Sequence, residues 1–464
     1  MRGIQLSELL EATPVGSGEA LDLVAAFDDT LVQGLARLGE DRAAALTALA
    51  AAVAGTPLGA SVAEAAGKVA AGSFTEEHLT ALAGARTALF GAVHDARLTG
   101  LDTALGRTRQ TWEEPPAAAP VPDNLLAGCR SWLQELAITG WRGVDHDLIS
   151  AADQTVEALL ADPASRRPAV LLDGLATELR AASPLATADR LPVRRWADLW
   201  ARGLLLAHGG ERSGGAGPVE SVSGRLLILG VDVHEHATAV QAQVHGVLEP
   251  TGGGPSRLVR TAVTAAKVDT IVGPALWRLL HRHPVLLTAL AEQRALEITE
   301  LPVLAGGDLV WHDDRATAGE PADPFVTARV QLADAVAAPV PPLERHPVRI
   351  AEPVFLEGYT TDGGVLELDG TTLPFDLERL PGCGPLTPAL VAASAACIGL
   401  LRWGGDRWAL QPLAVQATVK RKKTDVHGGA WAMGITDPKL AKADARAGDA
   451  VAVLRERAGR LLRK

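Results

Sequence analysis

The first half of the chain carries apolar residues at helical spacing. Behind Ser17 they recur every three or four residues, which predicts an amphipathic helix: Val24, Phe27, Leu31 and Leu35. An Ala-rich run follows and ends at Gly55, where we expect a second helix to stop. Ser73 and Glu76 have the spacing of a capping box, so Ser73 is expected to begin a further helix. The pattern therefore predicts a helical domain over residues 1–112.

Two stretches of helix-breaking residues follow. The Pro-rich run at 113–123 predicts a linker. The Leu-rich residues 124–208 are expected to form a second helical segment, in which Trp196 and Trp200 lie one turn apart and face a core. The Gly- and Ser-rich run at 209–218 predicts a second, flexible linker.

Beyond this linker the hydrophobic pattern changes to partial alternation. Residues 223–249 are rich in Val, Ile and Leu and predict two strands that turn near 235–237. A third strand is expected over 257–271. Residues 274–295 have the pattern of a helix, which Pro284 should kink or break.

The remaining segments alternate between strand and helix signals. FVTARVQLADAV fits either a strand or a helix. We expect strands over 296–311, a meander over 347–377, a small-residue helix over 387–402 around Cys397, and a hairpin over 402–418 that turns at 404–406.

These elements predict a multidomain chain. An all-α N-terminal half precedes an α+β domain over 219–419. Strands and helices do not alternate regularly there, so a mixed or antiparallel sheet is favoured over a doubly wound sheet or a TIM barrel.

Composition narrows the class of protein. No apolar run reaches the ~18–20 residues that span a bilayer, and the opening residues lack the apolar stretch of a secretory signal. The three cysteines lie far apart, so neither a disulfide framework nor a cysteine-rich metal site is expected: Cys129, Cys383 and Cys397. We expect a cytoplasmic protein that does not contact a membrane.

The sequence lacks three motifs that identify common enzyme classes. The glycine run at 251–257 lacks the lysine of a phosphate-binding loop. No GxGxxG follows a strand, and no GxSxG occurs. We therefore expect no catalytic residue and no cofactor.

Two histidines do suggest a chemical role, because their spacing suits a metal site. His234 and His236 face the same side if they lie on a strand, and two imidazoles there are suitable ligands for Zn²⁺ or another divalent ion. His312, followed by two aspartates, is a candidate third ligand. A metal-dependent hydrolase centred on this pair is one functional alternative. The other interpretation is an exposed polar turn between two strands.

Charge is distributed unevenly along the chain. The net charge is −11, but residues 420–464 hold 12 Lys and Arg against 5 Asp and Glu, which leaves 32 against 50 elsewhere. We expect a basic tail over 420–464 that ends in an amphipathic helix. Such an asymmetry is typical of contact with nucleic acid or an acidic partner, although a tail that folds back on the acidic body has the same composition.

One segment of this tail is a candidate contact site. Lys420, Arg421, Lys422 and Lys423 are suited to pair with phosphates or carboxylates, and Trp431 to stack on a base. A nucleic-acid binder that uses this tail is a second alternative, an acidic protein partner is a third, and a solvated loop remains the plain interpretation.

The segments GRLLILGVDVHEHATAVQAQV and PLAVQATVKRKKTDVHGGAW, in an Ala- and Arg-rich chain, resemble an uncharacterised actinobacterial family. That family is encoded beside MoxR-type AAA+ ATPases, von Willebrand A proteins and SWIM zinc-finger proteins. The resemblance implies an accessory component of a multi-protein, ATPase-associated system and no activity to transfer. Together with the missing enzyme motifs, it favours a non-catalytic binding or assembly protein with protein partners.

Overall fold

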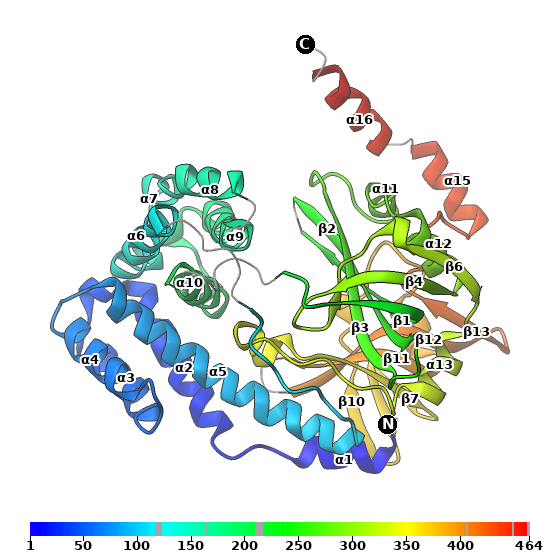
Figure 1. Cartoon of the computed structure of the whole chain (residues 1–464), viewed down its shortest axis with the longest axis horizontal. Coiled ribbons are helices and arrows are strands. Elements are labelled where there is room, and N and C mark those ends of the chain that lie inside the picture. Colours follow the sequence, from blue (N-terminus) through cyan, green and yellow to red (C-terminus); the bar gives the residue numbers. More distant parts are fainter. Residues whose placement is uncertain are drawn as a thin grey trace.

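The computed structural model describes residues 1–116, 123–162, 165–208, 217–236, 238–404, 407–447 and 450–461. Most of the second predicted linker, part of the first, and the predicted turn positions Ala237, Gly405 and Asp406 lie outside these residues. A helical half is followed by a half with several sheets, as predicted from the sequence (Figure 1).

The helical half packs as one body. A single core takes Phe27 and Leu82 from before the first linker and Leu133 and Trp200 from after it, so the two predicted helical segments share one interior. The described part of this half contains ten α-helices, joined in places by short 3₁₀ turns: α1 (Gly3–Glu11), α2 (Ser17–Gln33), α3 (Glu40–Ala52), α4 (Gly59–Ala70), α5 (Glu76–Leu105), α6 (Asp123–Thr139), α7 (His146–Ser150), α8 (Ala152–Ala161), α9 (Arg166–Ala182) and α10 (Val193–His208).

The predicted start of α5 is wrong by two residues. The Thr75 hydroxyl, not that of Ser73, caps the helix and accepts a bond from the backbone amide of His78 at 3.3 Å. The Ser73 amide instead donates to the Lys68 carbonyl at the end of α4. Ser73 therefore belongs to the end of the preceding helix, where its amide satisfies one of the carbonyls that a helix leaves open.

Helix α5 connects the two halves. Its 30 residues extend about 45 Å at 1.5 Å per residue. Its first part lies in the helical core with Leu82, and its last part carries Leu98 and Leu101 into a second core beneath the sheets. In Figure 1 the helix extends from the helical lobe to α1 and the base of the sheet half.

The first sheet closes on itself as a barrel. Strand β1 pairs with β2 and β4, β2 with β3, β3 with β5 in parallel, and β5 with β4. Two short helices lie between β3 and β4, and Pro284 occupies the first position of the second helix, which explains the predicted break. The elements are β1 (Glu220–Glu235), β2 (Ala239–Pro250), β3 (Arg257–Ala266), α11 (Ala275–Leu279), α12 (Pro284–Glu292), β4 (Arg294–Val303) and β5 (Asp308–Leu309).

This order, 1-2-3-5-4-1 with a helical insertion between the third and fourth strands, is the connectivity of OB-fold barrels. Strand β1 is long enough for both pairings, with β4 over Glu220–Leu226 and with β2 over Gly224–Glu235, and its register with β2 shifts between Ile228 and Gly230. The barrel interior contains the inward residues of these strands and of α11 and α12.

A second sheet packs against the barrel. It has the order β13-β12-β11-β7, and a small meander of β8, β9 and β10 lies beside it. Its elements are β7 (Ala351–Glu357), β8 (Thr360–Asp362), β9 (Val365–Leu368), β10 (Thr371–Pro374), α14 (Pro388–Ala392), β11 (Ser394–Gly404), β12 (Arg407–Val419) and β13 (Lys422–His427).

The predicted helix over 387–402 is wrong. Only α14 is helical, and Cys397 lies in strand β11. Both faces of β11 are buried, with Cys397 in the core below the sheet and Ile398 in the core toward the barrel. A strand covered on both sides has a continuous run of small and apolar residues, which sequence pattern does not separate from a buried helix.

The ambiguous segment before the meander, FVTARVQLADAV, begins as a helix: it follows strand β6 (Ala316–Pro321) and contains most of α13 (Pro324–Gln331).

The predicted tail boundary at 420 is wrong, because β13 pairs with β12 and Trp431 lies in the barrel core. The chain then forms α15 (Pro438–Ala447) and α16 (Ala450–Leu461), which project from the sheet half in Figure 1. No helix in the described ranges has the length and apolar character to cross a bilayer.

Candidate functional site

A polar cavity of about 390 Å³ lies where the barrel, the second sheet and the end of α5 meet. One wall is the outer face of β1, β2 and β3. The opposite wall is the segment 337–353, and Arg402 of β11 and His94 of α5 complete the lining. The cavity therefore joins residues that lie more than 300 positions apart in the sequence.

Strand alternation supplies the barrel wall. Along β2, Val240, Ala242 and Val244 point into the barrel core. The residues between them point outward and line the cavity: Gln241, Gln243 and His245. These three carry neutral groups that both donate and accept hydrogen bonds.

Arg260 and Asp308 make an ion pair on this wall. The Arg260 guanidinium donates to both carboxylate oxygens, at 2.7 and 3.2 Å. Their side chains remain 40% and 37% exposed although they lie between the two halves. Both residues line the cavity.

The opposite wall carries a buried carboxylate. Glu352 contacts Arg109 at 3.0 Å and Arg107 at 3.2 Å. Burial on its own would raise the pKa of Glu352, but the two guanidiniums outweigh it and lower the pKa to about 2. Glu352 is therefore a fixed negative charge, held by two positive ones.

Asp232 organises the side of the cavity toward β11. It accepts hydrogen bonds from Arg402 at 2.7 Å and from Gln411 at 2.8 Å. Its Oδ2 also lies 3.1 Å from Nε2 of His234. Burial would raise the pKa of Asp232, but the hydrogen bond and charge of His234 and the charge of Arg402 lower it well below its usual range. The carboxylate thus orients the His234 ring at the cavity wall.

His245 is the unusual group in this wall. Its side chain is 1% exposed, and neither ring nitrogen has a hydrogen-bond partner within the described residues. Burial, reinforced by the charge of Arg260, lowers the pKa of this imidazole to about 3. A neutral ring with two unused polar atoms beside a cavity has hydrogen-bonding capacity for a ligand.

The structure separates the three predicted metal ligands. His234 lines the cavity, whereas His236 is exposed just past the end of β1, and His312 is exposed before a short 3₁₀ helix. Across the described ranges no three His, Cys, Asp or Glu side chains are grouped to hold a metal ion. The sequence signal for His245 is the outward alternation that it shares with Gln241 and Gln243.

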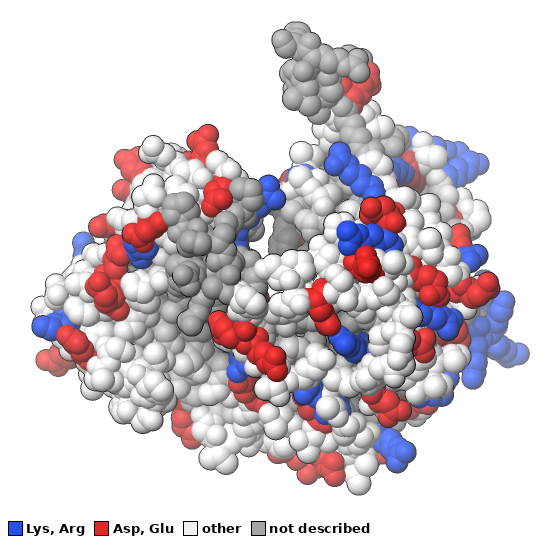
Figure 2. Space-filling view, viewed as in Figure 1, with Lys and Arg blue, Asp and Glu red and all other residues white. Residues whose placement is uncertain are grey.

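The predicted basic contact site is divided between surface and core. Lys420, Arg421, Lys422 and Lys423 are all exposed at the hairpin between β12 and β13. Figure 2 shows Lys and Arg side chains gathered at the edge where Figure 1 labels β13. Trp431 is only 8% exposed.

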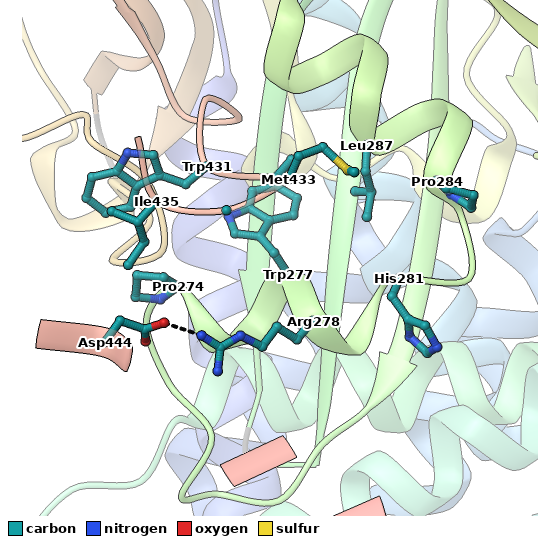
Figure 3. Close-up of a pocket in the computed structure, with 12 residues that line it drawn as sticks. Pro274, Trp277, Arg278, His281, Pro284, Leu287, Trp431, Met433, Ile435 and Asp444 are labelled. Atoms are coloured by element: carbon teal, nitrogen blue, oxygen red, sulfur yellow. Dashed lines mark hydrogen bonds and ion pairs between the residues drawn. The ribbon is translucent and has the colours of Figure 1, made fainter. Parts of the chain in front are cut away.

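A second pocket, of about 270 Å³, surrounds that tryptophan. Trp431 and Trp277 line it together with Met433, and Arg278 forms an ion pair with Asp444 of α15 at its rim (Figure 3). The Trp277 indole N–H donates to the Cys383 carbonyl at 2.9 Å. The indole of Trp431 thus belongs to the inside of the barrel half and is not presented beside the basic hairpin.

Comparison of the chain with family models, with curated proteins and with solved structures finds no match. Function is therefore inferred from the geometry of the cavity and the hairpin.

Proposed function

We propose that this chain is a non-catalytic binding protein that encloses a small polar molecule in the central cavity. The observation that carries the proposal is His245, a buried imidazole that lines the cavity and whose two nitrogens have no partner among the described residues. Leaving such a group without a hydrogen bond costs about 1–3 kcal/mol. A ligand that bonds to it recovers this energy.

The neighbouring groups define the kind of ligand. Gln241 and Gln243 present amides to the cavity beside His245. On this wall the charge of Arg260 is neutralised by Asp308. The barrel wall therefore favours an uncharged, hydrogen-bonding moiety, such as a sugar ring or a nucleobase, over an ion.

The lining supports binding rather than covalent catalysis. No described lining residue is a serine, threonine, cysteine, lysine or tyrosine, so the cavity offers no hydroxyl, thiol or amine nucleophile. His234 with Asp232 has the form of a general base, and the hydrolase alternative depends on that pair. The three cysteines are buried away from this cavity, and burial raises the pKa of each thiol.

The barrel supports the same proposal by analogy. OB-fold barrels bind oligonucleotides and oligosaccharides on the face of their second and third strands. That is the face that carries Gln243 and Arg260 here. The analogy concerns the fold alone, and one fold carries many functions.

Native mass spectrometry of the gently purified protein tests the proposal. We expect an added small-molecule mass that acid denaturation releases. His245→Leu should reduce its occupancy at least fivefold, while the control His312→Ala, at an exposed histidine outside the cavity, should not. The proposal fails if no adduct is present and no nucleoside or monosaccharide raises the thermal midpoint of the native chain.

The basic hairpin supports a second candidate function, contact with an acidic protein partner. Its four consecutive basic residues are exposed, and Trp431, which would stack on bases, is buried. This favours carboxylates over nucleic acid. A role beside an ATPase, as the family resemblance implies, would use such a surface.

Charge reversal tests this second function. Lys422→Glu with Lys423→Glu should abolish a salt-sensitive complex in native cells, whereas Lys439→Glu with Lys442→Glu on α15 should retain it. A gel shift with single-stranded DNA that the first pair abolishes would favour nucleic acid instead.

A further inference from the structure

Three guanidiniums converge on one carboxylate at the edge of the central cavity. Glu344 accepts from Arg202 of α10 at 3.0 Å and from Arg167 of α9 at 3.2 Å. Arg349, two residues before β7, is its third partner. Glu344 and Arg349 both line the cavity.

This arginine cluster, Arg167, Arg202 and Arg349, has more positive charge than the carboxylates of the described residues around it neutralise. The second carboxylate in reach, Asp198, is 3.9 Å from Arg202. It is shared with Arg86, whose Nη1 lies 3.7 Å away. Among the described residues, these three arginines therefore pair with one full carboxylate and part of another.

Arg202 shows the excess most directly. The residue is 9% exposed, and its Nε has no hydrogen-bond acceptor among the described residues. Burial and then the charge of Arg349 lower its pKa. A buried guanidinium with an unused donor, crowded by a like charge, is stabilised by an added anion.

The geometry selects the kind of anion. A planar carboxylate pairs well with one guanidinium, whose two parallel N–H groups match its two oxygens. Here the guanidiniums come from three separate segments, and one of them belongs to the first turn of α9, a helix of 17 residues. A phosphate has three acceptor oxygens for three partners, and a helix N-terminus adds a favourable field.

We propose that the arginine cluster is the anion subsite of the cavity and takes the phosphate group of the bound molecule. The inference rests on the proposed binding function. It names the ligand class as a phosphate monoester of a polar molecule, with its uncharged part against Gln243 and His245. Free inorganic phosphate has the same chemistry and is the simplest probe.

Calorimetric titration of the full chain with inorganic phosphate at low ionic strength tests the subsite. We expect saturable binding that Arg349→Gln weakens at least tenfold. Glu344→Gln removes the competing carboxylate and should tighten binding. Arg180→Gln is the matched control, because Arg180 lies on α9 at similar exposure and pairs with Asp153 away from the cluster.

The result that overturns the proposal is the absence of saturable phosphate binding, or equal effects of Arg349→Gln and Arg180→Gln. Circular dichroism of each variant shows whether it is folded. Since a simple loss of structure weakens binding in both Arg349→Gln and Glu344→Gln, their opposite directions distinguish a site from a folding defect.

Ribose 5-phosphate distinguishes a phosphate monoester from free inorganic phosphate as the ligand of this subsite. We expect it to bind at least fivefold more tightly than inorganic phosphate, and His245→Leu to remove that advantage without changing the affinity for phosphate. Equal affinities of the two probes, unchanged in His245→Leu, would overturn the assignment of a monoester. If phosphate binds but no small-molecule adduct is found and no nucleoside or monosaccharide raises the thermal midpoint, the proposed function fails and the anion site stands.

Discussion

His245 and Arg260 occupy directly paired positions of β2 and β3, yet only one of them is satisfied. Arg260 donates two hydrogen bonds to Asp308, and the His245 ring has no described partner. The arginine charge beside it disfavours protonation of the imidazole. The strand pairing thus holds a neutral ring at the cavity wall.

His245→Leu should therefore stabilise the ligand-free protein. Replacing an unpaired polar group by an apolar one of similar size removes its desolvation cost, so the free energy of unfolding should rise by about 1 kcal/mol. Urea denaturation measures this. His94→Leu is the contrast, since His94 is also buried at the cavity but bonds to Asp95 at 2.8 Å, and its loss should destabilise. Destabilisation by His245→Leu would show that the ring has a partner.

Acid should destabilise the fold through two buried histidines. Burial lowers the pKa of His245 and of His346 to about 3, against 6.5 for the unfolded chain. The unfolded state then binds more protons between these values. The stability that each ring contributes is present in full above pH 6.5 and is lost as the pH falls toward 3, at about 1.4 kcal/mol per pH unit for each histidine.

Unfolding free energies between pH 7 and pH 4.5 measure this effect. His245→Leu should reduce the slope of the unfolding free energy against pH by the contribution of that one histidine. A slope that the substitution leaves unchanged would mean that His245 titrates normally in the folded protein.

A cation–π contact holds α5 to the second sheet. The Arg97 guanidinium carbon lies 3.3 Å from the centre of the Trp403 ring, and both residues are 7% exposed. A desolvated contact of this kind contributes about 2 kcal/mol. Because methionine removes this contact, we expect Arg97→Met to lower the free energy of unfolding by about 1–2 kcal/mol.

Arg329→Met is the matched control for this contact. Arg329 lies 5.2 Å from the Phe355 ring and its side chain is 45% exposed. Its loss should cost roughly 0.5 kcal/mol, as for an exposed pair. Similar losses in the two variants would contradict the importance of burial at Arg97.

The turn of the basic hairpin is a strained conformation. Lys420 and Arg421 have φ of 50° and 69°, and they join the paired residues Val419 and Lys422 as a two-residue loop. Asn-Gly is the preferred sequence for such a turn, because other residues meet steric strain at positive φ. Lys420→Asn with Arg421→Gly should stabilise the protein by about 1 kcal/mol in urea denaturation.

The same variant measures what the charges do. If the hairpin binds an acidic partner, the stabilised variant should bind more weakly in low salt. A more stable protein with undiminished binding would show that the positive turn has no role in contact.

Local pattern predicted the parts of the fold that local physics determines. Ser17 begins α2, and Pro284 opens α12, because helix periodicity and the missing proline amide act within a few residues. The pattern failed at Cys397, where burial on both faces hides the strand period. It also failed at Trp431, whose burial depends on a barrel formed by distant strands.

The candidate site divides in the same way. Sequence alone identified His234, because two histidines at alternate positions of a strand are visible in the chain itself, and it determined that the hairpin carries four basic residues. Only the tertiary structure placed His245 without a partner and brought Arg167, Arg202 and Arg349 to Glu344. Burial and charge balance are properties of surfaces that meet across the fold, and no local spacing encodes which surfaces will meet.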